Sequence, residues 1–324
     1  MSSVQDVTRE DVKEFYGNAG RTPQPGLCCP TIYTKDDISH IPQEVMEISY
    51  GCGSPVTLAE VKEGEVFLDL GSGGGVDCFI ASRKVGKSGR VIGVDMTPDM
   101  MQRATANTAK VAKNLGYYNV EFRHGFLEDV PVDEKFVDIV TSNCVVNLSN
   151  DKKKVFSEIW RILKNGGRFV ISDIVAEKPV PIEMQKDKIL WGECISGALT
   201  EQEFQDFAKE QGFYGLQVLK REFYKEANGH NFWSVTLRGW KFEKSDVCNY
   251  IGQFATYLGP YATVTDDEGH TYERNIPFKI CTDTAKKLNS APYKGYFLLA
   301  GPDAEGGSAS DCCAPASNGK SSCC

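Results

Sequence analysis

Cysteines are the residues with the most distinctive chemistry in this chain, which has 12 of them among 324 residues. Cys52 lies in a turn between two glycines, Cys144 follows an apolar run, and Cys194 comes 50 residues after Cys144. The first residues alternate polar and charged types without an apolar run, so we expect no signal peptide and a cytoplasmic protein whose thiols stay reduced. Unusual cysteines in that setting indicate catalysis, redox cycling or binding of a soft metal or metalloid.

The composition argues against several classes of partner. The formal net charge is −8 and the pI about 5.2, whereas proteins that bind nucleic acid or anionic membranes need a basic face. No apolar run approaches the roughly 18 residues of a membrane span. We therefore expect no nucleic-acid partner and no membrane partner. A monomer is a further expectation.

Strands and helices alternate along the middle of the chain, which predicts an α/β fold with a parallel, doubly wound sheet. A first helix is expected over 8–15 and a second over 41–48, ahead of this alternation. The predicted strands are 66–70, 90–94, 119–124, 136–141, 167–173, 216–222 and 231–237. The predicted helices between them are 76–85, 98–115, 152–163, 183–192 and 201–211, and the turn 164–167 is expected to cap the helix before it. Strands over 253–258, 271–280 and 295–300 indicate a small second unit.

A glycine-rich turn follows the first of these strands, in Leu70-Gly71-Ser72-Gly73-Gly74-Gly75. Glycines allow the backbone to approach a ligand, but such a run alone is compatible with NAD, FAD or S-adenosylmethionine, or with a purely structural turn. The next strand ends in Asp95, which is placed to accept hydrogen bonds from both ribose hydroxyls. Met96 can then lie against an adenine ring, and the segment with Leu127 and Glu128 can reach the adenine amino group.

Asp69, just before the turn, suits a ligand that carries an α-amino group better than it suits a pyrophosphate. Over residues 61–240 the chain therefore resembles the class I S-adenosylmethionine-dependent methyltransferases. This resemblance predicts S-adenosyl-L-methionine as the cofactor. The residues expected to bind it are Asp69, Gly71, Ser72, Gly73, Asp95, Met96, Leu127, Glu128 and Asn143.

Three sequence strings around cysteines make the resemblance more specific. YGCGSP, SNCVVNLS and LWGECISGAL occur in the order seen in the arsenite methyltransferases, and the similarity extends over about residues 8–300. It implies that Cys144 and Cys194 are the main ligands of arsenic(III), that Cys52 is the third thiol, and that an N-terminal cysteine joins a redox cycle. The tandem pair Cys28 and Cys29 supplies that cysteine, and the sequence does not distinguish between the two.

The chemistry of arsenic is consistent with this assignment. Trivalent arsenic is soft and prefers sulfur ligands, and three thiolates leave its lone pair available for attack on a sulfonium methyl group. No general base is required, so the enzyme has to supply approach and alignment. A zinc site is the main structural alternative, but the cysteines that bind zinc usually come in pairs that are close in sequence. The expected activity is methylation of arsenite and then methylarsenite, in arsenic detoxification.

Regeneration of trivalent arsenic is expected to use a disulfide between Cys52 and Cys28 or Cys29, reset by thioredoxin or glutathione. We also expect Tyr50 to form part of the wall of the acceptor site, Asn147 to position the sulfonium or close the pocket, and Glu193 to accept a proton from a thiol. The alternatives are a methyltransferase for a small organic acceptor and a metalloid-binding thiol protein without enzymatic activity.

The expected organisation has four parts, one of which contains an insertion. They are an N-terminal segment with redox cysteines (1–60), a methyltransferase domain (61–242) with an arsenic-binding insertion (178–208), a small C-terminal domain (243–303) and a flexible cysteine-rich tail (304–324). The tail pairs, Cys312-Cys313 and Cys323-Cys324, are candidate collectors of arsenicals. Cys78, Cys248 and Cys281 are expected to have no part in the arsenic chemistry.

Overall fold

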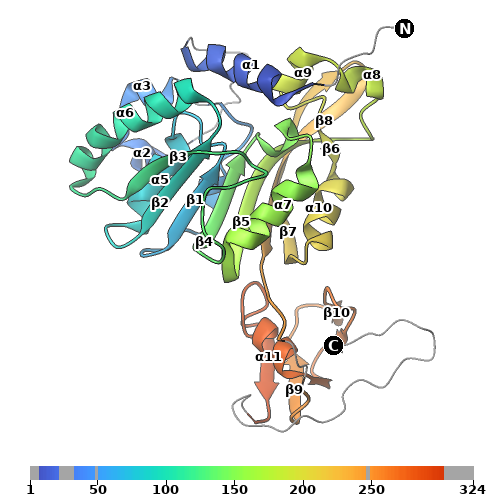
Figure 1. Cartoon of the computed structure of the whole chain (residues 1–324). Coiled ribbons are helices and arrows are strands. Elements are labelled where there is room, and N and C mark those ends of the chain that lie inside the picture. Colours follow the sequence, from blue (N-terminus) through green and yellow to red (C-terminus); the bar gives the residue numbers. More distant parts are fainter. Residues whose placement is uncertain (1–6, 22–32, 48–49, 246–248, 303–324) are drawn as a thin grey trace. The chain divides into compact units, whose positions relative to one another are not determined.

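A computed structural model describes residues 7–21, 33–47, 50–245 and 249–302 (Figure 1). The chain divides into two compact units, the first ending at Gly239 and the second beginning at Trp240. The described part of residues 1–60 belongs to the first unit. Cys28, Cys29, Cys248 and the cysteine pairs of the tail lie outside the described residues. None of the described helices is long and apolar enough to cross a membrane.

The first unit is built on one sheet of eight strands. Seven of them lie in the order β3-β2-β1-β4-β5-β8-β7, and β6 pairs with β5. Strands β3, β2, β1, β4, β5 and β6 pair in parallel, which confirms the predicted doubly wound fold. The strands are β1 (Val66–Leu70), β2 (Arg90–Asp95), β3 (Val120–His124), β4 (Val137–Asn143), β5 (Leu163–Ala176), β6 (Leu199–Thr200), β7 (Tyr214–Ala227) and β8 (His230–Trp240).

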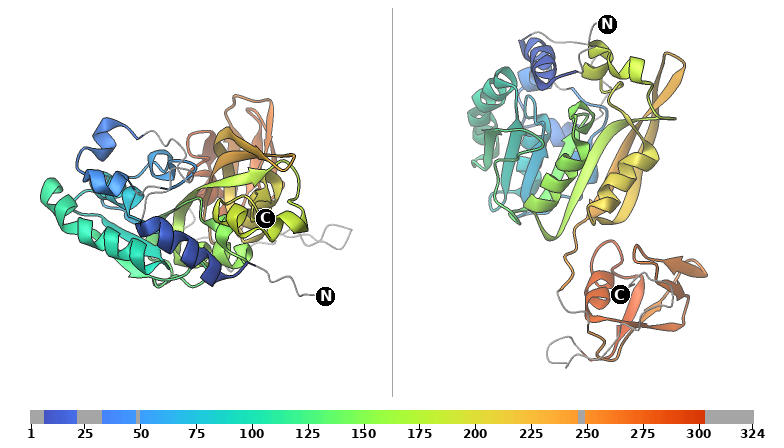
Figure 2. Two further views of the ribbon diagram at one scale, coloured as in Figure 1. Left: turned by 90° about the horizontal axis from the view of Figure 1, so that it is seen from above. Right: turned by 45° about the vertical axis from the view of Figure 1, so that its right-hand side comes forward.

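Helices cover both faces of this sheet (Figures 1 and 2). Within the first unit they are α1 (Arg9–Arg21), α2 (Lys35–Ile38), α3 (Gln43–Met46), α4 (Pro55–Leu58), α5 (Val76–Val85), α6 (Pro98–Leu115), a 3-10 turn η2 (Val146–Leu148), α7 (Lys152–Ile162), α8 (Ile182–Gln185), α9 (Lys188–Gly192) and α10 (Glu201–Glu210). Helix α1 contacts α6 and α9.

Successive residues of the central strands point to opposite faces and enter two separate cores. Leu68 and Leu70 of β1 pack in the core that α7 and α10 cover, where Phe156 and Phe204 are buried. Phe67 of the same strand packs in the core that α5 covers, beside residues of α3, α4 and α6. Burial on both faces explains why these strands are almost wholly apolar until they reach their carboxyl ends.

Several elements differ from the sequence prediction. The predicted helix 183–192 is two short helices, because the Asp187 side chain accepts hydrogen bonds from Ile189 N and Leu190 N and starts α9. The turn 164–167 does not cap α7, which ends at Ile162, since Leu163 is already extended and begins β5. Gly166 nevertheless has the expected positive φ, +81°.

The second unit contains a three-stranded sheet, β12-β9-β13, and a two-stranded one, β10-β11. Its elements are β9 (Gln253–Tyr257), β10 (Thr263–Thr265), β11 (Thr271–Glu273), β12 (Pro277–Ile280), α11 (Thr282–Leu288) and β13 (Phe297–Ala300). The single strand predicted over 271–280 is two strands, separated by Asn275 with φ +63°. Helix α11 was not predicted.

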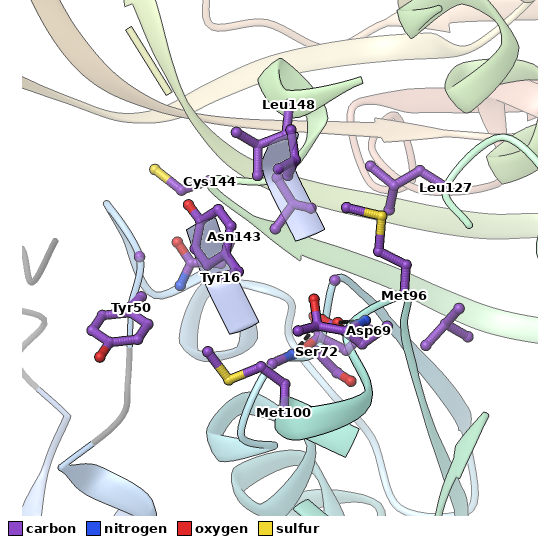
Figure 3. Close-up of a pocket in the computed structure, with 18 of the residues that line it drawn as sticks. Tyr16, Tyr50, Asp69, Ser72, Met96, Met100, Leu127, Asn143, Cys144 and Leu148 are labelled. Atoms are coloured by element: carbon purple, nitrogen blue, oxygen red, sulfur yellow. Dashed lines mark hydrogen bonds between the residues drawn. The ribbon is translucent and has the colours of Figure 1, made fainter. Parts of the chain in front are cut away.

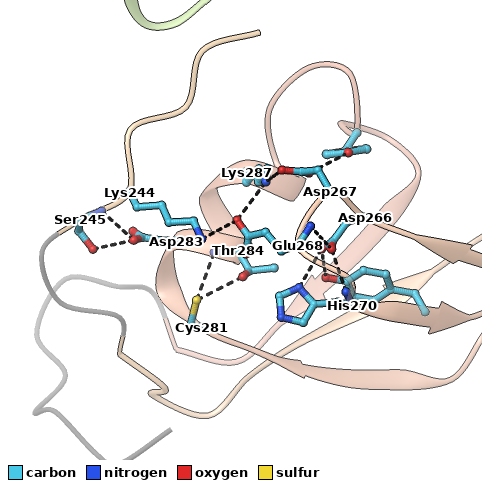
Figure 4. A network of polar contacts seen from close by, with 12 residues as sticks. Lys244, Ser245, Asp266, Asp267, Glu268, His270, Cys281, Asp283, Thr284 and Lys287 are labelled. Carbon is cyan, nitrogen blue, oxygen red and sulfur yellow. Dashed lines mark hydrogen bonds and ion pairs between the residues drawn. The ribbon is translucent and has the colours of Figure 1, made fainter. Parts of the chain in front are cut away.

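Polar contacts link the loops of the second unit (Figure 4). The buried Lys287 ammonium forms ion pairs with Asp267 and Glu268. His270 Nδ1 lies 2.9 Å from Asp266 Oδ2, and this hydrogen bond raises the pKa of His270. The contacts tie the loop between β10 and β11 to α11, in a unit with a small hydrophobic core.

The Asp266–His270 pair predicts a pH-dependent stability. Because the folded pKa of His270 is raised, its contribution is complete below the unfolded pKa of about 6.5 and is lost as pH rises through the folded value. We expect His270→Gln to lower the free energy of unfolding by about 1 kcal/mol at pH 6 and by less at pH 8.5. Calorimetry of the full chain checks this, and an equal loss at both pH values would contradict it.

Candidate active site

A cavity lies at the carboxyl ends of β1, β2 and β4 (Figure 3), and residues of α1 also line it. Ligands bind at this edge of doubly wound sheets because the loops that follow the strands diverge there. Every residue predicted to bind the cofactor lines the cavity: Asp69, Gly71, Ser72, Gly73, Asp95, Met96, Leu127, Glu128 and Asn143. Cys144, Cys194 and Tyr50 line it as well.

The glycine-rich turn and Asp95 form one end of the cavity. The Asp95 carboxylate accepts hydrogen bonds from Gly73 N at 2.9 Å and Thr97 N at 2.7 Å, which fix its orientation. Gly73 has φ +50°, and no atom lies within 4 Å of the position where a Cβ would be. The Ser72 hydroxyl is buried and has no hydrogen-bond partner among the described residues. The turn therefore offers unused polar groups to a ligand.

Two further buried carboxyl groups lie beside the turn. Burial raises the pKa of Asp69 well above its usual value, and the nearby charge of Asp77 raises it further. Burial also raises the pKa of Asp77 to about 6, even though Asp77 accepts hydrogen bonds from Tyr33 Oη at 2.8 Å and Asn143 Nδ2 at 3.4 Å. A ligand that carries positive charge would allow both groups to ionise. Sequence analysis missed Asp77, although it directly follows the glycine-rich turn in the first turn of α5.

The structure brings together three cysteines that are far apart in the sequence. Cys52 and Cys144, separated by 92 residues, form a disulfide with a Cα–Cα distance of 5.8 Å. Cys194 is buried, and its Sγ donates a hydrogen bond to the Cys144 carbonyl oxygen at 2.7 Å. The expected pairing was Cys52 with Cys28 or Cys29, so the pairing within the described residues differs from that expectation.

Two of these cysteines have an unusual backbone conformation. Cys144 has φ +58° and Cys194 has φ +61°, in the left-handed region that costs a residue with a side chain about 1–2 kcal/mol. Such strain persists where the surrounding structure imposes it, and it is common at functional sites. In both places it turns the chain sharply after a regular element, β4 or α9.

Asp173 and Asn147 lie behind the cysteines. An Asp173 carboxylate oxygen and the Sγ atoms of Cys52 and Cys144 all lie within 4.8 Å of one another. Burial raises the pKa of Asp173 to about 7. Asn147 was expected to position the sulfonium or close the pocket. Its side chain does not line the cavity but is buried, and it donates hydrogen bonds to Asp173 Oδ1 at 2.8 Å and the Cys194 carbonyl oxygen at 3.3 Å. Sequence analysis missed Asp173, although it ends the strand predicted over 167–173.

Helix α1 supplies the remaining wall. Tyr16 Oη donates a hydrogen bond to the Gly192 carbonyl oxygen at 2.9 Å, and burial together with the nearby Cys194 raises the pKa of Tyr16 well above 10. Arg9 forms an ion pair with Glu128 at 3.1 Å and lies over the Phe126 ring. Nothing in the local sequence of α1 marks these residues, because their role depends on where the helix docks.

Two other predicted residues have partners outside the cavity. Glu193 forms an ion pair with Lys225 at 2.6 Å, so its carboxylate is already engaged. Tyr50 Oη donates a hydrogen bond to the Ala19 carbonyl oxygen at 2.9 Å and thereby joins the segment before Cys52 to α1. Tyr50 lines the cavity, as expected for a residue of its wall.

Comparisons with known proteins match both units. Residues 61–212 match a family model described as a methyltransferase domain, and residues 244–322 match a domain of unknown function. The arsenite methyltransferase of Aquipseudomonas alcaligenes is 32% identical over 90% of this chain and 90% of its own length. That of Homo sapiens is 32% identical over 92% of this chain and 86% of its own length.

A solved structure is similar over most of the chain. The crystal structure of an arsenic(III) S-adenosylmethionine methyltransferase from Chlamydomonas reinhardtii is 32% identical, with a TM-score of 0.64. The similarity covers 85% of this chain and 98% of the algal one.

The disulfide can be tested directly. Peptide mapping of protein that is alkylated and digested without a reductant should recover a crosslinked peptide pair containing Cys52 and Cys144. After reduction, both cysteines should be alkylated. A crosslink from Cys52 to Cys28 or Cys29 as the main species would contradict the pairing seen in the structure.

Proposed function

Because the chain belongs to the arsenite methyltransferase family, we propose that it transfers methyl groups from S-adenosylmethionine to trivalent arsenic, first in arsenite and then in methylarsenite. One observation carries the proposal. Cys144 and Cys194 line the same cavity as the glycine-rich turn and Asp95, and Cys52 is bonded to Cys144. A site for a nucleoside cofactor and a cluster of soft ligands therefore lie side by side.

The residues of the cavity fit S-adenosylmethionine. We assign Asp95 to the ribose hydroxyls, Met96 and Leu127 to the adenine ring, and Glu128 to the adenine amino group. Asp69 and Asp77 provide buried negative charge for the cationic part of the cofactor, and the unpartnered Ser72 hydroxyl is available to it. The bound cofactor would supply an electrophilic methyl group.

We assign arsenic(III) to Cys144 and Cys194, with Cys52 as the third ligand for arsenite. Sulfur is the preferred donor for a soft ion, and a site of three thiolates leaves the arsenic lone pair free to act as the nucleophile. No proton leaves the attacking atom, so the reaction requires no general base. The chain has only 4 histidines, and none of them lines the cavity. The contribution of the protein is to hold the two reactants in line.

The disulfide supports a redox step that follows methyl transfer. Methylation leaves arsenic formally pentavalent, with bonds to the methyl group and to sulfur. If the bonds from arsenic to Cys52 and Cys144 break while the Cys52–Cys144 bond forms, the sulfurs are oxidised and arsenic regains an electron pair. The product stays bound to Cys194 until a thiolate completes its coordination. Two thiols then have to reduce the disulfide by exchange.

Burial of this disulfide limits which reductants can reach it. Cys52 is only 6% exposed and Cys144 is half-buried. We therefore assign the reduction to small thiols such as glutathione, or to Cys28 or Cys29 of the same chain. Thioredoxin would then act on a disulfide that those thiols form. In a cell this cycle would serve arsenic detoxification.

Changing Cys144 or Cys194 to serine should abolish both methylation steps. A hydroxyl is a poor ligand for soft arsenic, so we expect activity on arsenite and on methylarsenite to fall at least about 100-fold. Product analysis with arsenite or methylarsenite, S-adenosylmethionine and a thiol reductant measures this.

Cys281 offers a matched control, because it is a buried cysteine of the second unit. The variant Cys281→Ser should methylate both substrates as the wild type does. Normal methylation of arsenite by Cys144→Ser would refute the thiol site.

Affinity for the cofactor should depend on pH through the buried acids. Below about pH 6 Asp77 is protonated and neutral, so its attraction for a cation is lost as pH falls. We expect the Kd of S-adenosylmethionine to increase severalfold as the pH is lowered from 7.5 to 5.5. Titration calorimetry measures this change. S-adenosylhomocysteine, which lacks the sulfonium charge, should change less. A pH dependence that persists unchanged in Asp77→Asn would rule out this origin.

A further inference from the structure

Asn143 and Asn147 stand on either side of Cys144, the central cysteine of the site, and each contacts a different one of the other two cysteines. We propose that they are positioning residues, each of which holds one pair of thiols together. Asn143 places Cys52 beside Cys144, and Asn147 places Cys194 beside Cys144. The proposal rests on the arsenic site assigned above and explains how that site is held together.

Asn143 holds the turn that contains Cys52. Its Oδ1 accepts hydrogen bonds from Cys52 N at 3.1 Å and Gly53 N at 3.2 Å, and its Nδ2 donates one to the Gly53 carbonyl oxygen at 2.9 Å. A Cβ on Gly51 would lie 2.6 Å from Asn143 Nδ2, so only glycine permits this close approach. One side chain thus satisfies three backbone groups of the turn and fixes it at the end of β4.

Asn147 holds the segment that contains Cys194. Its Nδ2 donates hydrogen bonds to the Cys194 carbonyl oxygen at 3.3 Å and the Ile174 carbonyl oxygen at 2.6 Å. Asp173 orients the residue by accepting hydrogen bonds from its Nδ2 and its backbone N, at 2.8 and 3.1 Å. A Cβ on Gly197 would lie 2.1 Å from the Asn147 carbonyl oxygen, so this segment packs directly on η2. None of these hydrogen bonds involves a sulfur atom, so they can persist while the thiols react.

The two asparagines are expected to matter differently for the two substrates. Arsenite has three exchangeable positions and can bind three thiolates. Methylarsenite has one As–C bond, so it binds only two, which we assign to Cys144 and Cys194. Loss of the Asn143 contacts should therefore affect arsenite and spare methylarsenite, whereas loss of the Asn147 contacts should affect both.

The test measures binding of each arsenical to the reduced full-length protein without cofactor, by titration calorimetry. We expect Asn143→Ala to weaken arsenite binding about tenfold, the size expected for a lost buried hydrogen bond, and to leave methylarsenite within about twofold. Asn147→Ala should weaken both about tenfold. If Asn147→Ala does not fold, Gly197→Ala, which displaces the same segment, should give the same pattern.

Asn119→Ala is the matched control. Asn119 is also half-buried, and its side chain bonds to Ser82 and the Gly86 carbonyl oxygen, but it does not line the cavity. We expect it to lower stability and leave both affinities unchanged. Equal losses for both arsenicals in Asn143→Ala, unchanged binding in Asn147→Ala, or losses in Asn119→Ala as large as in either variant would overturn the proposal.

A second readout needs no arsenic and so separates this proposal from the proposed function. After reduction and removal of the reductant, glutathione disulfide is added as the oxidant, and it is itself reduced to two glutathione thiols as the protein disulfide forms. The Cys52–Cys144 disulfide should then re-form several times more slowly in Asn143→Ala than in the wild type or Asn147→Ala, as followed by peptide mapping. Equal rates would refute the role of Asn143 even if arsenite is methylated. A wild type that binds neither arsenical would refute the arsenic assignment, while slower re-formation in Asn143→Ala would still support the positioning role.

Discussion

The left-handed turn of the backbone at Cys144 is the constraint on which the site depends. It comes directly after β4, the strand that lies between β1 and β5 in the sheet. Cys144 N donates a hydrogen bond to the Ser172 carbonyl oxygen at 2.8 Å, so the turn is tied to the neighbouring strand β5. The same residue bonds to Cys52 through sulfur and accepts a hydrogen bond from Cys194. Segments from three parts of the chain thus contact each other at the end of one strand. The packing and hydrogen bonds of the sheet offset the free-energy cost of the strained φ.

Uncompensated negative charge is the second constraint. Asp69 and Asp77 are buried and Asp95 is half-buried at one end of the cavity, where an ionised carboxyl group costs free energy without a cationic partner. A ligand with ammonium and sulfonium groups offsets that cost, so burial of the acids favours such a ligand over a neutral nucleoside. Because Cys144 and Cys194 line the same cavity as these acids, a cofactor bound there would share the cavity with the proposed nucleophile.

Much of the fold could be predicted from the sequence, because strands buried on both faces are continuous apolar runs bounded by glycine and proline. The bounds of β1, α5 and α6 agree with the prediction at both ends. The prediction is wrong where a local contact or turn interrupts a helix or strand whose residue pattern continues through it. Asp187 divides the helix predicted over 183–192, and Asn275 divides the strand predicted over 271–280. The pairing of Leu163 with Val137 extends β5 through residues that were expected to form a turn.

By itself, the sequence determined the class of the sheet, located the glycine-rich turn and singled out the cysteines that we propose as arsenic ligands, because apolar periodicity, glycine spacing and soft donor atoms are properties of residue types. Only the tertiary structure decided which sulfurs touch, since Cys52 and Cys144 are 92 residues apart and their distance depends on how the sheet brings their segments together. The same holds for Tyr16, Asp173 and Asn147, which acquire their roles by docking against Cys194 or behind the cysteines. Contacts between distant segments depend on the packing of whole elements, which no local pattern encodes.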